Sequence, residues 1–173
     1  MITINKIFII FLILFLTSCS YQKDSSEKEK IIEMVNLHAT AWSDGDINLL
    51  DSLLSDDVIF AYPGRRLNKT QTIEDLSYFK EHYNDTQVYI NKIMVDGNDL
   101  AVEWQFATTN IDTGQRQVVS DAIMARVEAG KFTVWKEYLD GRVKSLQASD
   151  ELFLEEGEEP YPWPLKTAKY GMK

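Results

Sequence analysis

The sequence has 173 residues and a formal net charge of −9 at pH 7, with 27 acidic and 18 basic side chains. A surface of this charge repels phosphate backbones and no basic stripe offsets it, so we expect no nucleic-acid partner. The length suits one domain with a true apolar core, and a single cysteine excludes an internal disulfide. The two histidines lie far apart, without cysteines or paired ligand spacing, and no phosphate-binding glycine loop is present. We therefore expect neither a metal nor a cofactor.

The first residues have the order of a secretory signal. Lys6 precedes an apolar run from Ile7 to Leu16, and Thr17-Ser18-Cys19 follows. The run is about half the ~20 residues that a membrane-spanning helix needs. The ending resembles the lipobox of bacterial lipoproteins, whose cysteine is lipidated and becomes the first mature residue. The resemblance implies a signal peptide over residues 1–18, a lipid on Cys19, and a protein anchored to a membrane of the bacterial envelope.

Helical signals come next along the chain. Residues 19–30 are polar and predict a tether, and a first helix is expected from about Glu27 to Asp44. Gly45 is placed to end this helix, and Asp46 can cap a second one that runs through Leu54. A third helix is expected to open at Thr70 or Thr72, with its buried face formed by Ile73, Leu76, Phe79 and Tyr83.

Strand signals dominate the second half. A first short strand, Val58–Tyr62, is broken by Pro63-Gly64. Four later strands are joined by tight turns and predict an antiparallel meander: Val88–Val95, Leu100–Ala107, Gln117–Val127 and Phe132–Leu139. Helices followed by a meander indicate the α+β class.

The chain ends differently. The acidic run Ser149–Glu159 is followed by Pro160-Tyr161-Pro162-Trp163-Pro164, which excludes a helix or a central strand. We expect a domain over residues 31–147 and a separate segment over 148–173. Because this segment carries large apolar side chains, we favour its lying over the domain rather than in solvent.

Three stretches of the sequence resemble segments of a known protein family: Ala41–Asp46, Phe60–Gly64 and Gly130–Asp140. Their order and spacing resemble the SnoaL-like branch of the nuclear transport factor 2-like superfamily. The resemblance implies a cone-shaped, strongly bent antiparallel sheet wrapped around three N-terminal helices, with a mostly apolar pocket at its open end. Such pockets serve isomerases, cyclases, epoxide hydrolases, dehydratases and plain binding modules, and the outer sheet face often forms homodimers. The fold alone does not decide the function.

Two residues match positions at which steroid-isomerase relatives carry functional groups. His38 matches their oxyanion-binding tyrosine, and histidine there can donate a hydrogen bond or act as a base. The alternative, given equal weight, is that His38 is an ordinary core histidine hydrogen-bonded to a backbone carbonyl. Tyr62 stands where those isomerases carry a carboxylate base; a phenol of pKa near 10 is a poor base, so Tyr62 is expected to line the pocket.

Two acids in the last strands are the other catalytic candidates. Asp121 shares a strand face with apolar residues, and an inward carboxyl there would have a raised pKa; an exposed carboxylate is the alternative. With a two-residue turn at Ala129-Gly130, Glu137 pairs with Ala122. Asp121 and Glu137 then face opposite sides unless a bulge intervenes, which predicts that one of them is structural.

These patterns support two hypotheses. The preferred one is a binding module that takes up a small apolar molecule between aromatic side chains: Trp42, Tyr62, Trp104, Phe106 and Trp135. The alternative is a cofactor-free isomerase, cyclase or hydrolase that uses His38 with Asp121 or Glu137.

Overall fold

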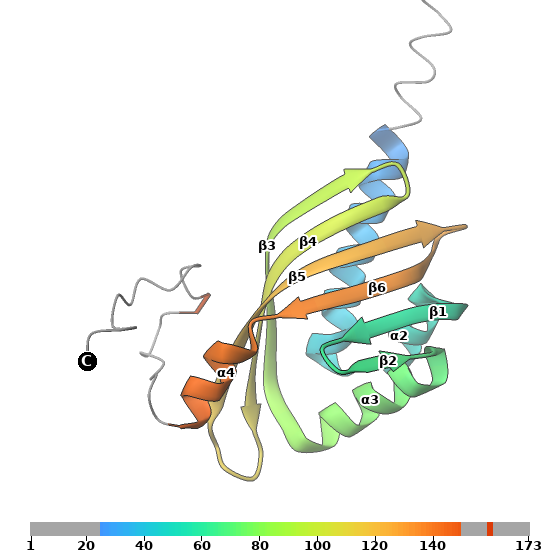
Figure 1. The fold of residues 1–173 in the computed structure, drawn as a ribbon. Helices are drawn as coiled ribbons and strands as arrows, with labels where there is room; N and C mark the ends of the chain where they lie inside the picture. The colour runs from blue at the N-terminus through green and yellow to red at the C-terminus, as the bar shows by residue number, and fades with distance from the viewer. Residues whose placement is uncertain (1–24, 150–158, 161–173) are drawn as a thin grey trace, which may run out of the picture.

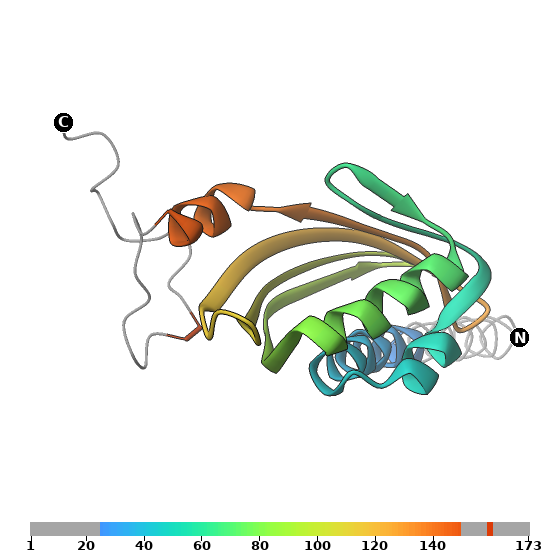
Figure 2. The ribbon, with the colours of Figure 1, turned by 90° about the horizontal axis from the view of Figure 1, so that it is seen from below.

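The computed structural model describes residues 25–149 and 159–160. In this part of the chain, a six-stranded sheet with the order β2-β1-β6-β5-β4-β3 is strongly bent. Its concave face covers the helices, as Figures 1 and 2 show from two directions. The predicted α+β class, with a bent sheet around N-terminal helices, is therefore confirmed. The leader, including Cys19, lies outside the described residues.

Local capping residues define the ends of the helices. The first helix covers residues 25–44 and ends at Gly45, whose φ of +65° suits a residue without a Cβ. Asp46 caps α2 (Ile47–Leu53), because its carboxylate accepts the Leu49 N–H at 2.9 Å. Asn68 begins α3 (Lys69–His82) with a reciprocal capping box.

Some boundaries differ from the prediction. Residues 25–30 are helical, so the first helix begins inside the segment predicted as a tether. The α3 helix begins at Lys69, earlier than Thr70 or Thr72, because Asn68 rather than a threonine supplies the cap. Tyr83, expected on the buried face of that helix, instead starts a strand.

The sheet contains the predicted meander and two further strands. Its strands are β1 (Leu54–Tyr62), β2 (Arg65–Leu67), β3 (Tyr83–Asp96), β4 (Asp99–Asn110), β5 (Arg116–Glu128) and β6 (Lys131–Leu139). Strands β3 to β6 pair in antiparallel order, and β1 lies parallel to β6. The short β2 forms a hairpin with β1 that was not predicted, because three residues beginning Arg65-Arg66 carry no alternating pattern.

The predicted register of the last hairpin is wrong by one residue. Glu128 pairs with Lys131 as expected, but β6 then contains one residue more than β5 at Thr133. Beyond this bulge Glu137 pairs with Ile123 instead of Ala122. Asp121, two residues from Ile123 on the same strand, therefore lies on the same face as Glu137. The bulge that the sequence analysis named as the exception is present, so the prediction that the two acids face opposite sides is wrong.

The core fills the space between the helices and the concave sheet face. Its largest fully buried side chains are Trp135, Phe60, Phe132, Leu50, Leu54, Leu76, Ile123, His38, Val35 and Thr72. They come from the first helix, α2, α3 and the inner face of the sheet. Burying each large apolar side chain contributes about 1.5–3 kcal/mol, so this core holds the bent sheet onto the helices.

A short helix, α4 (Gly141–Ala148), follows β6 and packs against β5. The Val118 N–H donates to Oε1 of Gln147 at 3.1 Å, and the Gln115 side chain donates to the Gln147 carbonyl at 2.8 Å. The β6 strand ends before it reaches this part of β5, so Gln147 supplies a hydrogen bond that a neighbouring strand would otherwise supply.

Glu159 is bound to the sheet. Its carboxylate accepts two hydrogen bonds from the Arg116 guanidinium, at 2.7 and 2.8 Å, and one from the Tyr89 hydroxyl at 3.0 Å. The guanidinium is the main cause that lowers the Glu159 pKa. The rest of the predicted 148–173 segment, from residue 150 on, lies outside the described residues.

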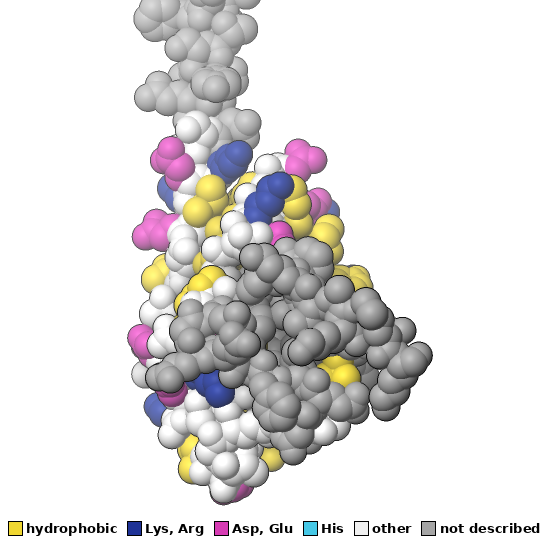
Figure 3. Space-filling view, turned by 90° about the vertical axis from the view of Figure 1, so that its left-hand side faces the viewer, with side chains coloured by type: hydrophobic (Ala, Val, Ile, Leu, Met, Phe, Trp, Pro, Cys, Tyr) yellow, Lys and Arg dark blue, Asp and Glu magenta, His cyan; other side chains and the backbone are white. Residues whose placement is uncertain are grey.

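None of the helices within residues 25–149 has the length and apolar character needed to cross a membrane. On the face shown in Figure 3, acidic and basic side chains of the described residues are interspersed. This face therefore has no continuous basic patch among the residues that can be seen there. The expectation that nucleic acid is not a partner stays a prediction.

Candidate functional site

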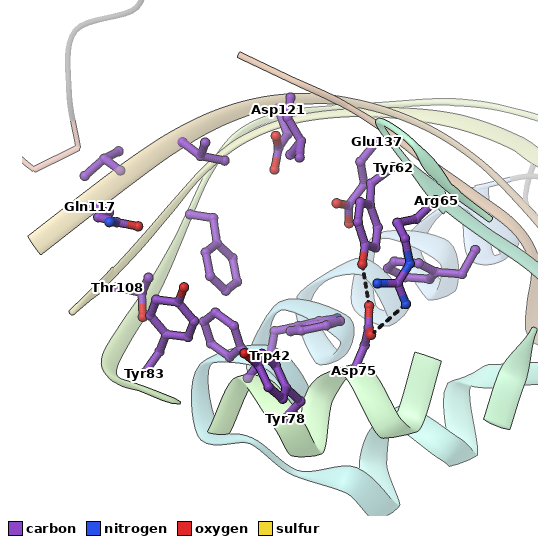
Figure 4. A pocket seen from close by; sticks show the side chains of 16 residues that line it. Trp42, Tyr62, Arg65, Asp75, Tyr78, Tyr83, Thr108, Gln117, Asp121 and Glu137 are labelled. Atoms are coloured by element: carbon purple, nitrogen blue, oxygen red, sulfur yellow. Dashed lines mark hydrogen bonds and ion pairs between the residues drawn. The ribbon is translucent and has the colours of Figure 1, made fainter. Parts of the chain in front are cut away.

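A cavity of about 340 Å³ opens between the concave sheet face and the helices. Side chains of the first helix, α3 and the inner face of the sheet surround it (Figure 4). The lining residues are Trp42, Phe60, Tyr62, Arg65, Asp75, Tyr78, Phe79, Tyr83, Phe106, Thr108, Gln117, Val118, Val119, Asp121, Glu137 and Leu139. The set is mainly aromatic and aliphatic with a few charged groups, which is typical of a small-molecule site.

Asp121 lies on β5 and is 5% exposed. Its Oδ2 accepts the indole N–H of Trp104 at 2.8 Å, whereas Oδ1 has no hydrogen-bond partner among the described residues. Burial raises the Asp121 pKa to about 7, although the bond from Trp104 opposes this change. The carboxyl is therefore poised between its neutral and ionised forms near neutral pH, and the alternative of an exposed carboxylate is wrong.

Glu137 on β6 has a matching arrangement. Its Oε1 accepts the indole N–H of Trp135 at 2.8 Å. Burial is the main cause that raises the Glu137 pKa to about 8; the negative charge of Asp121 adds to this change, and the bond from Trp135 opposes it. Because each acid disfavours ionisation of the other, the pair retains protons to a higher pH than ordinary carboxyls do.

The acid pair is a consequence of the bulge at Thr133. Without that extra residue, Glu137 would face away from Asp121, as the sequence register predicted. With the bulge, both carboxyls face the same cavity (Figure 4). An ionised carboxyl can accept a proton and a neutral one can donate it, so the pair contains the groups for general acid–base chemistry.

A second polar cluster lies beside the acid pair. The Tyr62 hydroxyl donates to Oδ2 of Asp75 at 2.6 Å, and Arg65 Nη2 lies 3.4 Å from Oδ1 of the same carboxylate. Burial is the main cause that raises the Tyr62 pKa to about 12, and Asp75 adds to it. Tyr62 is therefore not a base near neutral pH. Its hydroxyl oxygen can still accept a hydrogen bond from a ligand.

Neither Asp75 nor Arg65 was selected as a candidate from the sequence. The hairpin between β1 and β2, which brings Arg65 to Asp75 on α3, was not predicted, so their meeting was not foreseen. A signal for Asp75 existed in the helical spacing. Asp75, Tyr78 and Phe79 follow the i, i+3, i+4 rule, and all three line the cavity.

Aromatic rings form the wall opposite the acid pair. The Phe79 ring lies 5.2 Å from Phe106, 5.8 Å from Trp42 and 4.8 Å from Tyr83, measured between ring centroids. Figure 4 shows Trp42, Tyr78 and Tyr83 across the cavity from Asp121 and Glu137. Three residues predicted to bind a ligand, Trp42, Tyr62 and Phe106, line this cavity; that they bind one stays a prediction.

The other three predicted residues lie behind the cavity wall. His38 is completely buried, and its ring stacks on Trp135 with centroids 3.9 Å apart. Within residues 25–149 and 159–160, neither ring nitrogen has a hydrogen-bond partner, and burial lowers the His38 pKa to about 3. Trp104 and Trp135 direct their N–H groups to the acids but do not themselves line the cavity.

The structure places no metal-binding cluster among the described residues: no three His, Cys, Asp or Glu side chains there are grouped to hold an ion. The expectation of a site without metal or cofactor stays a prediction.

The bent, unclosed sheet around N-terminal helices is the cone of nuclear transport factor 2-like proteins, here with an acidic and aromatic cavity. Residues 35–135 match the SnoaL-like domain, and the chain belongs to this family. None of the proteins of curated function matches the sequence significantly.

Solved structures agree on the fold. An LEH-like epoxide hydrolase from Mycobacterium tuberculosis is 21% identical, with a TM-score of 0.63 over 71% of this chain and 92% of that one. A proposed polyketide cyclase from Pseudomonas putida is 22% identical, with a TM-score of 0.58 over 66% and 95%. IdmH, a proposed polyketide cyclase from Streptomyces antibioticus, is 16% identical, with a TM-score of 0.60 over 68% and 96%. At these identities the likeness establishes the fold alone.

Proposed function

We propose that the cavity takes up a small, largely apolar molecule and that Asp121 and Glu137 transfer protons to and from it. The protein would then be a cofactor-free isomerase, cyclase or hydrolase. One observation carries the proposal: two carboxyls with raised pKa values, the buried Asp121 and the partly buried Glu137, face the same cavity. The folds of an epoxide hydrolase and of proposed polyketide cyclases are compatible with this chemistry.

The roles follow from the hydrogen bonds. Near neutral pH one carboxyl is ionised and can take a proton from a C–H group or a water molecule, while the other is neutral and can donate a proton to a developing oxyanion. The indole N–H groups of Trp104 and Trp135 each hold one carboxyl oxygen, which leaves the other oxygen of each acid for the substrate. His38 has no part in this scheme, because it does not line the cavity.

The test follows proton transfer on simple probes. The protein is incubated with 2-tetralone in deuterium oxide, and exchange of the ketone's α protons is measured by NMR. Hydrolysis of styrene oxide is measured in parallel by chromatography. We expect one of these reactions to be accelerated and to slow by about 100-fold or more in Asp121→Asn and Glu137→Gln.

The matched control is Glu81→Gln, which removes an exposed carboxyl from the end of α3 and should leave the rate unchanged. Circular dichroism verifies that each variant is folded. Equal rates in the wild type and both cavity variants would overturn acid–base catalysis. Binding of the ketone without any acceleration would favour the simpler function of a binding module.

We further propose that Cys19 is lipidated and anchors the domain to a membrane of the bacterial envelope. The support is the Leu16-Thr17-Ser18-Cys19 sequence after a short apolar run. In a bacterial host, the wild type should fractionate with membranes and Cys19→Ser should not. A Cys19→Ser protein that remains in the membrane fraction would contradict the anchor.

We propose a homodimer formed through the outer face of the sheet. Met94, Met124 and Tyr138 expose 53%, 53% and 60% of their surface, although large apolar side chains are usually covered. Light scattering after size exclusion should give twice the protomer mass for the wild type, and the mass of one protomer for Met124→Lys. A wild type that has the mass of a single chain would contradict the dimer.

A further inference from the structure

The cavity is aromatic on one side and acidic on the other, which narrows the chemistry of its occupant. We infer that it binds a small organic monocation, an alkylammonium group carried by an otherwise apolar molecule. This inference rests on the proposed function, because it names the class of molecule that the same cavity would take up.

The charges around the cavity favour a cation. Arg65 is the only basic residue that lines it in the described part of the chain, and it is already paired with Asp75 at 3.4 Å. The Tyr62 hydroxyl donates to the same carboxylate, so this cluster is close to neutral as a whole. Asp121 and Glu137 then remain as the uncompensated charges. When one of them is ionised, the cavity has one net negative charge.

Asp121 presents an oxygen that lacks a partner. The side chain is 5% exposed, its Oδ2 is bonded to Trp104, and its Oδ1 faces no donor in the described residues. An unpaired buried carboxylate oxygen is costly, so it requires a proton or a positive group beside it. A purely apolar occupant would exclude water and leave this oxygen unsatisfied. An ammonium group would compensate its charge.

The opposite wall supplies the other half of a cation site. Trp42, Phe79, Tyr83 and Phe106 form a continuous cluster, with neighbouring ring centroids 4.8–6.3 Å apart. The faces of aromatic rings attract cations through their quadrupole, most strongly for tryptophan and most effectively where water is excluded. The same rings pack against methyl groups, so an alkylated ammonium fits this wall better than a hydrated metal ion does.

A monocation is also compatible with proton transfer. One positive charge balances one ionised carboxyl, and the second carboxyl retains its proton. A dication would instead favour loss of both protons and so remove the acid. The inferred occupant therefore leaves both an acid and a base in the cavity.

The experiment compares two molecules of the same shape. Choline and 3,3-dimethylbutan-1-ol differ in a quaternary nitrogen that replaces a quaternary carbon, so only the charge changes. Each is titrated into the full-length protein in detergent micelles, with the indole N–H signals of Trp104 and Trp135 as the NMR readout. We expect choline to bind about tenfold more tightly near pH 8.

Single substitutions separate the contribution of the Asp121 carboxylate to choline binding from that of the aromatic wall. Asp121→Asn should weaken choline and leave the neutral alcohol unchanged, whereas Trp42→Leu should weaken choline more than the alcohol. Glu81→Gln is the control on an exposed carboxyl and should change neither affinity. The preference for choline should shrink near pH 5, because both cavity acids are then neutral.

Three outcomes would overturn the inference. If the alcohol binds as tightly as choline near pH 8, the site does not select cations, while the proposed uptake of an apolar molecule remains supported. If choline binds equally well to the wild type and to Asp121→Asn, its site lies elsewhere. If neither molecule binds, the cation site is rejected, and the tetralone and styrene oxide measurements decide the proposed function separately.

Discussion

Each acid in the cavity is held by one tryptophan, and this pairing controls where the acid ionises. Trp104 and Trp135 donate at the same distance, 2.8 Å, to Asp121 and Glu137. A hydrogen bond to a carboxylate favours its ionised form, so each indole partly offsets the effect of burial. The tryptophans thus act as positioning residues. The sequence had instead predicted that they form part of the ligand-binding surface.

Replacing the donor should change the titration of its acid. Trp104→Phe retains an aromatic ring but removes the N–H, and we expect the Asp121 pKa to rise above about 7 by about 1. Carboxyl ¹³C NMR across a pH series measures this value. The control is Trp42→Phe, because the Trp42 N–H has no partner in the described residues. An unchanged or lower Asp121 pKa in Trp104→Phe would contradict the role.

At the scale of the elements, the hairpin between β5 and β6 decides how the site is assembled. Its turn places Ala129 at φ +49° and Gly130 at φ +72°, as a two-residue turn with both residues in the left-handed region requires. The bulge that follows at Thr133 then brings Glu137 to the inner face. A turn that suits the strands and a bulge that shifts them are both needed for the acid pair.

Ala129 is strained in this turn, so Ala129→Gly should stabilise the protein. An L-residue in the left-handed region costs about 1–2 kcal/mol, partly offset by the greater entropy of glycine in the unfolded chain. We expect the free energy of unfolding in urea to rise by about 0.5–1 kcal/mol.

Replacing a glycine of positive φ by alanine tests the same backbone strain in the opposite direction. Gly97 has φ +58° in the turn between β3 and β4, and a Cβ there would meet no atom within 4 Å. Gly97→Ala should therefore destabilise by about 1 kcal/mol through backbone strain alone. If both substitutions change stability in the same direction, the strain argument fails.

At the scale of the whole molecule, the two cavity acids, Asp121 and Glu137, make stability depend on pH. Their pKa values are about 7 and about 8 in the folded protein, against ordinary values of 3.8 and 4.5. Between these values the folded state binds more protons than the unfolded state, so the free energy of unfolding falls as pH rises. This contribution is complete below about pH 4 and is lost by about pH 8.

Asp121→Asn should remove part of this fall, because a neutral amide does not ionise. We expect the variant to gain stability relative to the wild type as pH rises from about 5 to about 8, by an amount on the order of 1–3 kcal/mol. Urea unfolding at several pH values measures it. A difference that is constant across this range would show that Asp121 titrates at its ordinary pKa.

At acidic pH, His38 has the opposite effect on the free energy of unfolding. Burial lowers its pKa from 6.5 to about 3, so the unfolded state binds more protons between these values. Stability from this group is present above about pH 6.5 and is lost as pH falls. His38→Leu should lose less stability than the wild type between about pH 6 and about pH 4. Equal losses in the two proteins would contradict the buried, neutral imidazole.

Much of the fold was readable in the residues. The helix cap at Asp46, the stop at Gly45 and the period-two strands depend on local chemistry, which a sequence displays directly. The β2 hairpin was missed because its three residues have no pattern of their own and pair only through β1. The C-cap at Tyr83 was missed because an aromatic residue fits a helix face and a strand equally well.

The sequence by itself determined the class of fold, the meander and the selection of Asp121 and Glu137 as candidate catalytic acids. Only the tertiary structure decided that both face one cavity, because a single extra residue at Thr133 reverses the face of everything after it. It also placed His38 behind Trp135 and brought Arg65 and Asp75 to the cavity. Composition and spacing report which side chains are present, whereas register and the crossing of distant elements decide which of them meet.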